Sequence, residues 1–390
     1  MNEILMPLAI ITALGLLVVL IKVLNQLDKF NNELTRQPAI FSQNVKQRAF
    51  LSKAKWYIYW LIIIPSVGSV FYYFNQSSTQ QKLKEREKIE RVAKFDSTKV
   101  WEAPELKKIL DEPNYSTLQY GFDLISHTAD YLGPEGIVKP ISNGMNCQNC
   151  HLAGASIPFG NNYSAVAATY PKFRARSGSL ETIVKRVNDC FQRSLNGKEL
   201  DSTSREMTSI IAYIKWLGAN VPKGKIPKGS GLLKLPYLSR PANPDSGHIV
   251  FVSKCQSCHG TNGQGLPMPE GNGRRYPPLW GEHSFNEAAG LYRLSNLAGY
   301  VKANMPFGAT YKSPQLTDAE AWDVASFVNT QPRPKHPFLK TDWPKIAGKP
   351  FDHPFGPYVD SFPESQHKFG PFQPIIDFQK KKQTEKVAKK

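Results

Sequence analysis

The chain has 390 residues, and 49 Lys and Arg against 32 Asp and Glu give a formal net charge of +17. A hydrophobic content of 41% excludes wholesale disorder, and five Cys are too few for a disulfide-stapled scaffold of this size. The length predicts two to three domains. The basic balance suggests nucleic acid, an anionic membrane or an acidic partner. We expect no nucleic-acid partner, because the sequence contains no zinc-finger spacing, RNP-like aromatic motif or basic leucine zipper.

Two uncharged apolar runs, residues 4–21 and 56–74, are found near the start of the chain. Each is close to the roughly 20 residues that a helix needs to cross a bilayer, and a mid-span Pro65 is tolerated there. A cleaved signal peptide is the competing interpretation of the first run. Glu3 in place of a basic residue before the run, and the lack of an A-x-A site after it, favour an uncleaved anchor. A buried soluble helix is a third alternative.

The segment between the two runs is basic and sets the expected orientation. It carries Asp28 and Glu33 against a larger group of cations: Lys22, Lys29, Arg36, Lys46, Arg48, Lys53 and Lys55. The positive-inside rule places such a loop in the cytoplasm. We therefore expect residues 1–80 to form two transmembrane helices with a cytoplasmic loop, in a bacterial inner membrane. Residues 81–114, rich in Glu and Lys, predict a helical stalk that carries the remaining chain on the periplasmic side.

The chain contains two C-x-x-C-H motifs: Cys147, Cys150 and His151, and Cys255, Cys258 and His259. Two thiols at this spacing can each add to one vinyl group of a haem, and the following His then becomes an axial iron ligand. A thioredoxin-type pair does not need the His and seldom occurs twice, and zinc needs paired ligand sets. The sequence therefore predicts two covalently bound c-type haems. Such attachment takes place outside the cytoplasm, in agreement with the charge-derived topology.

Helical patterns flank each motif. We expect helices at 117–131 and 204–217 around the first motif, and at 247–252 and 318–329 around the second. Thr317 to Glu320 has the pattern of a capping box at the start of the last helix. This layout is typical of small class I cytochromes c. The predicted fold is mainly α, with two tandem class I cytochrome c domains at 115–220 and 241–332, joined by a Pro-, Gly- and Lys-rich linker and preceded by the two transmembrane helices.

The distal ligand of the second haem is expected to be Met305. It lies in an Asn-Met-Pro sequence between the attachment motif and the closing helix, where a cytochrome c fold delivers its distal Met. A thioether ligand raises the reduction potential and suits electron transfer. Met268 is the alternative ligand, although its position is more typical of a loop residue.

The first unit has no comparable Met, but it contains Cys190, the only Cys outside the two motifs. Cys190 lies on a predicted helix over 179–196, where Arg186, Cys190 and Ser194 share one ridge at i, i+4 and i+8. A buried structural thiol is one interpretation. A thiolate bound to haem iron is the other, because an unpaired thiol outside the cytoplasm normally pairs or oxidises. Arg186 and Arg193 would favour the thiolate. The spacing leaves both interpretations open.

The last segment, residues 333–390, contains no further haem motif. Its Pro-, Phe- and Gly-rich stretches predict an extended strap packed on the domains. The Lys-rich end, residues 380–390, is expected to be disordered. We expect His367 to be a surface or packing residue.

Four stretches of the chain resemble one known family. They are Asn143-Gly144-Met145-Asn146 before the first motif, Phe159-Gly160-Asn161-Asn162-Tyr163, Phe173 to Ser179, and Arg186-Val187-Asn188-Asp189-Cys190. These residues are similar to those of the dihaem thiosulfate dehydrogenases. The resemblance covers roughly residues 115–370 and includes the unpaired Cys with its Arg neighbours. The two membrane spans are unusual for that family, whose members are mostly soluble periplasmic proteins.

The resemblance implies roles for individual residues. His151 and Cys190 would be the axial ligands of the catalytic haem. The positions that match the family's active-site residues are Arg176, Arg186 and Ser194. The second haem, with His259 and Met305, would pass electrons onward. Some members exchange this Met for a preceding Lys on reduction, but Asn304 occupies that position here and the exchange is not expected.

The reaction implied by the resemblance joins two thiosulfates into tetrathionate and releases two electrons, or runs in reverse. The Arg residues would position a small anionic sulfur substrate. A periplasmic cytochrome or a terminal oxidase would be the redox partner. The alternative is a non-catalytic dihaem electron carrier between respiratory complexes, which the membrane anchor favours. A haem-based sensor is a weaker alternative, because the sequence contains no output domain.

Overall fold

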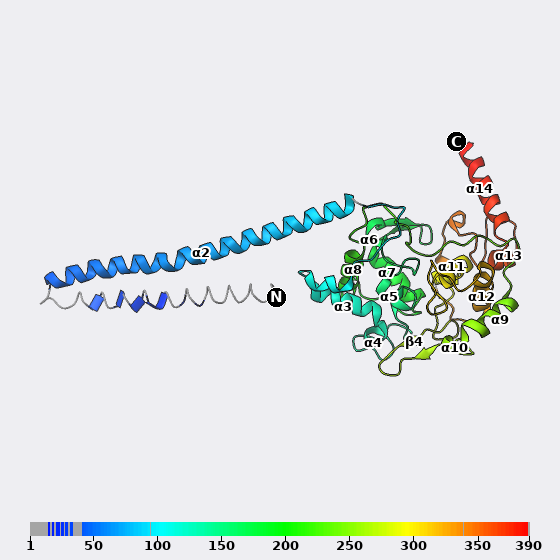
Figure 1. Ribbon diagram of the computed structural model, residues 1–390, viewed down its shortest axis with the longest axis horizontal. Coiled ribbons are helices and arrows are strands. Elements are labelled where there is room, and N and C mark those ends of the chain that lie inside the picture. The colour runs from blue at the N-terminus through cyan, green and yellow to red at the C-terminus, as the bar shows by residue number, and fades with distance from the viewer. Residues whose placement is uncertain are drawn as a thin grey trace. The chain divides into compact units, whose positions relative to one another are not determined.

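The computed structural model describes residues 41–93, 95–337 and 339–388, together with isolated positions between 15 and 33. The chain divides into two compact units, residues 1–93 and 94–390. The described part is mainly helical, and its sheets are two short antiparallel pairs (Figure 1). The mainly α fold expected from the sequence is confirmed.

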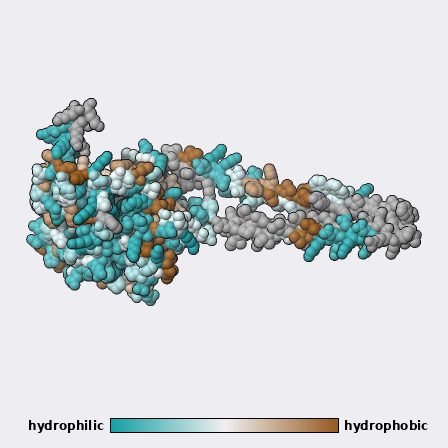
Figure 2. All heavy atoms as spheres, turned by 180° about the vertical axis from the view of Figure 1, so that it is seen from behind, coloured by the Kyte–Doolittle hydropathy of each residue, from teal (hydrophilic) through white to brown (hydrophobic). Residues whose placement is uncertain are grey.

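Within the described part of the first unit, the long helix α2 (Phe41–Ala93) includes Pro65. Between 56 and 74 this helix exposes large apolar side chains such as Leu61 and Phe71. Figure 2 shows hydrophobic residues on the surface of the long helix. The other apolar run, residues 4–21, lies almost entirely outside the described residues. Within the described ranges, no helix combines the length and the apolar character that crossing a membrane requires.

The predicted stalk, 81–114, is divided between the two units. Residues 81–93 are the last part of α2, which begins at Phe41. Trp101 and Ile109 instead are buried in the second unit, and the Trp101 amide donates to the Lys228 carbonyl at 2.9 Å. The short helix η2 (Leu106–Asp111) lies in this stretch. The later part of the predicted stalk therefore belongs to the second unit. The physical reason is that burial of Trp101 and Ile109 removes two large apolar side chains from water.

The first domain of the second unit has its own hydrophobic core, with buried Leu124, Phe191, Met207 and Tyr213 among its members. Helices α3 (Tyr115–Ser126) and α8 (Arg205–Leu217) pack closely on each other. A Cβ at Gly121 would lie 2.1 Å from the Ser209 carbonyl oxygen, so this approach requires glycine. The remaining elements are α4 (Thr128–Leu132), η3 (Cys147–Asn149), α5 (Leu152–Ala155), α6 (Val166–Thr169), β1 (Lys172–Arg174), β2 (Ser179–Glu181) and α7 (Ile183–Arg193).

The second domain repeats this design around a separate core. Its helices α9 (Pro244–Lys254) and α12 (Asp318–Thr330) make the corresponding close contact. A Cβ at Gly247 would lie 1.9 Å from the Asp323 carbonyl oxygen. The other elements are α10 (Gln256–His259), β3 (Leu266–Pro267), β4 (Arg274–Tyr276), η4 (Gly290–Tyr292) and α11 (Leu294–Asn304). In both domains, then, the helix before the attachment motif packs on the closing helix, as in a cytochrome c.

The capping box at the start of α12 is confirmed, and it predicts a pH-dependent contribution to stability. Glu320 accepts hydrogen bonds from Lys254 Nζ (2.8 Å) and the Thr317 amide (2.7 Å). These two bonds, the first the larger, lower the pKa of Glu320 from 4.5 to about 2. We expect this contribution, about 1 kcal/mol because the group is partly exposed, to be present above pH 4.5 and lost as the pH falls towards 2.

Thermal unfolding of the wild type and Glu320→Gln near neutral pH and in acid checks this prediction. The variant should be less stable near neutrality, and the difference should shrink in acid. A difference that does not change with pH would contradict the role assigned to the carboxylate.

The C-terminal segment is a strap that contacts both domains. Asp342 pairs with Arg193 of α7 in the first domain. Asp352 accepts bonds from Arg293 and Ser295 at the start of α11 in the second. His367 is a packing residue, as expected: it is buried and stacks on Tyr358 with ring centroids 3.6 Å apart. The strap includes the short helices η5 (Leu339–Thr341), η6 (Ile346–Gly348) and α13 (Glu364–Phe369).

The end of the chain differs from the expectation of disorder. Residues Gln373–Ala388 form helix α14 (Figure 1). Its first turn is anchored because Phe372 and Ile375 are buried in the core of the second domain. Lys382 Nζ also donates to the Val359 carbonyl at 3.0 Å. Apolar anchoring at one end therefore supports a helix that the Lys-rich composition does not suggest.

Candidate functional site

The first attachment motif is held by a local network. Cys147 begins the single turn η3, and the side chains of Asn146 and Asn149 cap it reciprocally. The Cys147 amide donates to Thr128 Oγ1 at 2.9 Å. His151 Nδ1 lies 2.5 Å from the Asn161 carbonyl oxygen. Because that carbonyl can only accept, Nδ1 carries the proton and Nε2 is left with a lone pair for a metal. This tautomer is the one that an axial haem ligand requires.

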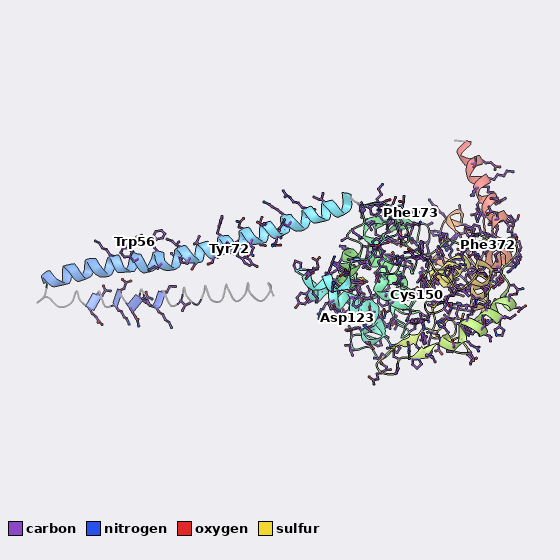
Figure 3. All side chains as sticks on the ribbon, in the orientation of Figure 1. Trp56, Tyr72, Asp123, Cys150, Phe173 and Phe372 are labelled. Carbon is purple, nitrogen blue, oxygen red and sulfur yellow. The ribbon has the colours of Figure 1, made fainter. Side chains whose placement is uncertain are left out.

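A cavity of about 120 Å³ adjoins this motif. Cys147, Cys150 and His151 contribute one part of its lining. Apolar side chains supply much of the rest: Ile125, Val166, Ile183, Val187, Phe191, Leu195, Ile210 and Ile214. Two thiols, a metal-ready imidazole and an apolar wall fit a covalently bound haem. Figure 3 labels Cys150, which belongs to the second unit.

Helix α7 brings three of the predicted site residues to this cavity. Arg186, Cys190 and Ser194 all line it, as their ridge spacing predicts. The helix begins at Ile183 instead of the expected 179, with Thr182 as its N-cap. Cys190 therefore shares a cavity with His151, as a second axial ligand must. The site residues themselves remain predictions, but the structure brings these four together.

The electrostatics of the α7 ridge follow from this placement. The pKa of Arg186 is raised, chiefly by its electrostatic interaction with Cys190 and in spite of burial. Arg193, which was expected to favour a thiolate at Cys190, forms an ion pair with Asp342 instead. Its guanidinium forms two bonds to the Asp342 carboxylate, at 2.6 and 2.8 Å. Arg186 is thus the cation of α7 that faces the cavity.

Arg176 occupies a different position from the other predicted site residues. It lies in the turn between β1 and β2 and is absent from the residues that line the cavity. Its Nη1 donates to the Ala288 carbonyl at 3.3 Å, and its guanidinium lies 5.7 Å from the Trp343 ring centroid. Burial, followed by the charges of Arg193 and Arg186, lowers the pKa of Arg176 to about 10. Among the described residues, its buried Nε has no hydrogen-bond partner.

The β1–β2 hairpin adds basic residues that the sequence analysis missed. Lys172 and Arg174 share one face of β1, and Glu181 opposes Lys172 on β2. Burial, with the charges of Arg174 and Arg186, lowers the pKa of Lys172. These three cations are therefore neighbours. The sequence did contain a signal for a basic strand at this position. Basic residues recur at every second position, Lys172, Arg174 and Arg176, which is the periodicity of a β-strand. The opposite face of the hairpin carries the exposed Phe173 (Figure 3).

Tyr163 also belongs to the site and was not predicted as a site residue. It lines the cavity, and its ring centroid lies 4.6 Å from that of His151. Together with the Asn161 carbonyl, this ring contact fixes the plane of the imidazole. Tyr163 lies in one of the four stretches that carry the family resemblance, but no role was assigned to it there.

The second attachment motif has the same design. Cys255 precedes the single turn α10, which ends at His259. His259 Nδ1 lies 2.9 Å from the Pro277 carbonyl oxygen, so Nε2 is again left for a metal. Met305 follows directly after α11, and its amide donates to the Val301 carbonyl. Met268, the alternative ligand, is 40% exposed beside β3. Assignment of Met305 as the distal ligand stays a prediction.

The two centres are connected by hydrogen bonds from α11. Tyr300 donates from its hydroxyl to the Asn149 carbonyl, inside the first C-x-x-C-H motif, at 2.9 Å. Asn304, next to Met305, donates to the Phe159 carbonyl at 3.2 Å and to the Tyr300 carbonyl at 2.9 Å. The element that leads to Met305 therefore contacts the segment of the first domain that carries the first attachment motif.

Comparison with known proteins agrees with this design. Residues 138–222 match the SoxA/TsdA cytochrome c domain, and residues 245–332 match the cytochrome c domain. A thiosulfate dehydrogenase from Psychrobacter arcticus is 36% identical over 62% of this chain and 71% of its own length. One from Allochromatium vinosum is 39% identical over 50% of this chain and 72% of its own length.

A solved structure is also similar. The thiosulfate dehydrogenase TsdBA from Marichromatium purpuratum, in its as-isolated form, aligns with a TM-score of 0.56 at 27% identity. The alignment covers 61% of this chain and 50% of that one. Two cytochrome c domains, each with a complete attachment motif, carry two covalently bound c-type haems. The chain belongs to the thiosulfate dehydrogenase family and is a dihaem c-type cytochrome with oxidoreductase activity of that type.

Proposed function

We propose that this protein interconverts thiosulfate and tetrathionate at the first haem, ligated by His151 and Cys190. Electrons pass to or from a second haem ligated by His259 and Met305. One observation carries the proposal: His151 and Cys190 line the same cavity, with Arg186 beside them. The names of the relatives support the choice of thiosulfate as the substrate.

The basic residues around the cavity suit this substrate. Thiosulfate is a dianion, and two dianions about 4 Å apart repel by about 4 kcal/mol even in bulk water. Fixed cations offset this repulsion without reorganisation during the reaction. Arg186 supplies a forked donor that matches sulfonate oxygens, and Lys172 and Arg174 add positive charge nearby. These residues would hold two anions close enough for a bond to form between their outer sulfur atoms.

The stoichiometry of the reaction shows which steps the protein must assist. Joining two thiosulfates forms one S–S bond and releases two electrons, with no proton transferred. Each bound c-type haem would supply a one-electron acceptor, so the two haems of this chain account for both electrons before they pass to a redox partner. His151 presents Nε2 because Asn161 engages its Nδ1, and Cys190 presents its sulfur from the facing helix. The Tyr300 contact to Asn149 gives released electrons a route towards the second domain.

Steady-state turnover of the haem-loaded protein tests the proposal. We expect thiosulfate oxidation with an artificial electron acceptor, and tetrathionate reduction with a reduced electron donor. The ratio of the two rates gives the favoured direction. A fully haem-loaded protein that turns over neither substrate would instead match the non-catalytic electron carrier.

We also propose that the N-terminal part anchors the protein in a bacterial inner membrane, with the haem domains on the periplasmic side. The exposed apolar side chains of α2 between 56 and 74 support this proposal, because water disfavours such a surface. Trp56 and Tyr72 lie towards the two ends of this stretch (Figure 3), as interfacial aromatic residues do.

Membrane fractionation checks the anchor. We expect the full chain to stay with the membrane after alkaline carbonate washing, and a chain that begins at residue 94 to be released. A periplasmic reporter fused after residue 388 should be active. Release of the full chain by carbonate would contradict the anchor, and an inactive reporter would contradict the orientation.

A further inference from the structure

The helix that carries Cys190 ends in an unusual way. The last carbonyls of any helix have no partner within it. In α7, the Ser194 and Leu195 amides both donate to the Cys190 carbonyl, at 2.9 and 3.0 Å. The Gly197 amide donates to the Phe191 carbonyl at 2.9 Å. The next two carbonyls, of Gln192 and Arg193, must find their donors elsewhere.

Asn286 of the second domain supplies both donors. Its Nδ2 donates to the Gln192 carbonyl at 2.8 Å, and its amide donates to the Arg193 carbonyl at 3.0 Å. The same Nδ2 also donates to Asn196 Oδ1 at 2.9 Å. Its own Oδ1 accepts from the Ala288 amide at 3.1 Å. Asn286 is only 1% exposed, so the C-terminal cap of α7 is a buried side chain from more than 90 residues downstream.

The loop around Asn286 makes further contacts with the first domain. Asn143, which lies before the first attachment motif, donates to the His283 and Ser284 carbonyls at 2.9 and 3.0 Å. The Ala288 carbonyl accepts from Arg176 at 3.3 Å. This loop, residues 283–288, therefore meets both the segment that leads to the haem cysteines and the predicted site residue Arg176. Both contacts come from outside the first domain.

We propose that Asn286 is a positioning residue for the first haem site. By capping α7 it fixes the depth and rotation of the helix, and thereby the distance of Cys190 and Ser194 from the haem. Correct thiolate ligation in the first domain then depends on docking of the second. This inference rests on the proposed ligation by His151 and Cys190.

Two variants and a matched control test the inference in the full-length, haem-loaded protein. Asn286→Ala removes both side-chain functions, and Asn286→Asp keeps the acceptor for the Ala288 amide but loses the donor to Gln192. Asn296→Ala is the control, because Asn296 donates to Gly290 within the second domain at 2.8 Å. Electron paramagnetic resonance of the ferric protein reports thiolate ligation independently of activity. Steady-state kinetics with thiosulfate report the functional consequence.

We expect both Asn286 variants to lose, or to split, the low-spin thiolate signal while the signal of the second haem stays unchanged. Thiosulfate kcat should fall by about 10- to 100-fold, with a smaller change in KM, because the reacting groups are misplaced. Asn296→Ala should match the wild type. If Asn286→Asp is haem-loaded and keeps the wild-type signal and kcat, the positioning role is overturned. If the wild type lacks a thiolate signal, the ligation by Cys190 fails first.

Discussion

Replacing Cys190 with Ala should lower thiosulfate and tetrathionate turnover by at least ~100-fold while leaving the haem content unchanged. In the proposed arrangement, Cys147 and Cys150 attach the haem and His151 is its proximal ligand, and all three lie in a different segment of the chain from Cys190. Loss of the Cys190 sulfur would remove the proposed second axial ligand. The first haem should lose its thiolate-ligated low-spin signal, and its reduction potential should rise.

The variant Cys190→Met separates two properties of the proposed thiolate ligand, its ability to bind iron and its negative charge. A thioether can still bind iron but carries no charge, so this variant should stay low-spin with a raised potential and low turnover. Haem stain and the spectrum of the second haem serve as controls for folding. Wild-type turnover in a haem-loaded Cys190→Ala variant would show that Cys190 is a structural thiol, the alternative that its spacing leaves open.

Replacing Arg186 with Gln should lower kcat/KM for thiosulfate by about 10- to 100-fold. Arg186 lines the cavity, and its pKa is raised chiefly by its electrostatic interaction with Cys190, so its guanidinium stays charged. A hydrogen bond to a charged group contributes about 1.5–3 kcal/mol, which corresponds to that range of rates. The loss should be larger for thiosulfate than for an uncharged artificial donor of electrons.

Lys185→Gln is the matched control for Arg186→Gln. It removes the same charge from the same helix, but Lys185 is exposed and its Nζ pairs with Asp189 at 2.6 Å, away from the cavity lining. We expect its kcat/KM to stay within about twofold of the wild type. An equal loss in both variants would show that overall charge, and not the placement of Arg186, determines thiosulfate binding.

The sequence predicted the helices that close the domains accurately. The prediction for 204–217 corresponds to α8, and that for 318–329 corresponds to α12. Each has a local start signal, Ser204 or Thr317 as N-cap, and a consistent apolar stripe. The prediction of a helix over 179–196 was wrong at its start. Residues 179–181 pair with β1, and this pairing with another segment has no local signal.

The site was predicted only in part, because its residues come from segments that are distant in the sequence. His151 and Cys190 lie 39 positions apart, and helical spacing could place Arg186 and Ser194 beside Cys190 but not beside His151. Only folding shows that all four reach one cavity. The basic hairpin residues Lys172 and Arg174, and the capping residue Asn286, belong to the same class of long-range neighbours.

By itself, the sequence determined the chemistry and the repeat: two C-x-x-C-H motifs, two haems, a mainly helical fold and the ridge of Arg186, Cys190 and Ser194. These features depend on covalent spacing and helical period, which are local properties of the chain. The tertiary structure decided which residues surround the ridge. It divided the predicted stalk between two units, paired Arg193 with Asp342, and brought Asn286 to the end of α7. Such contacts depend on burial and hydrogen bonding between distant segments, and no local pattern specifies them.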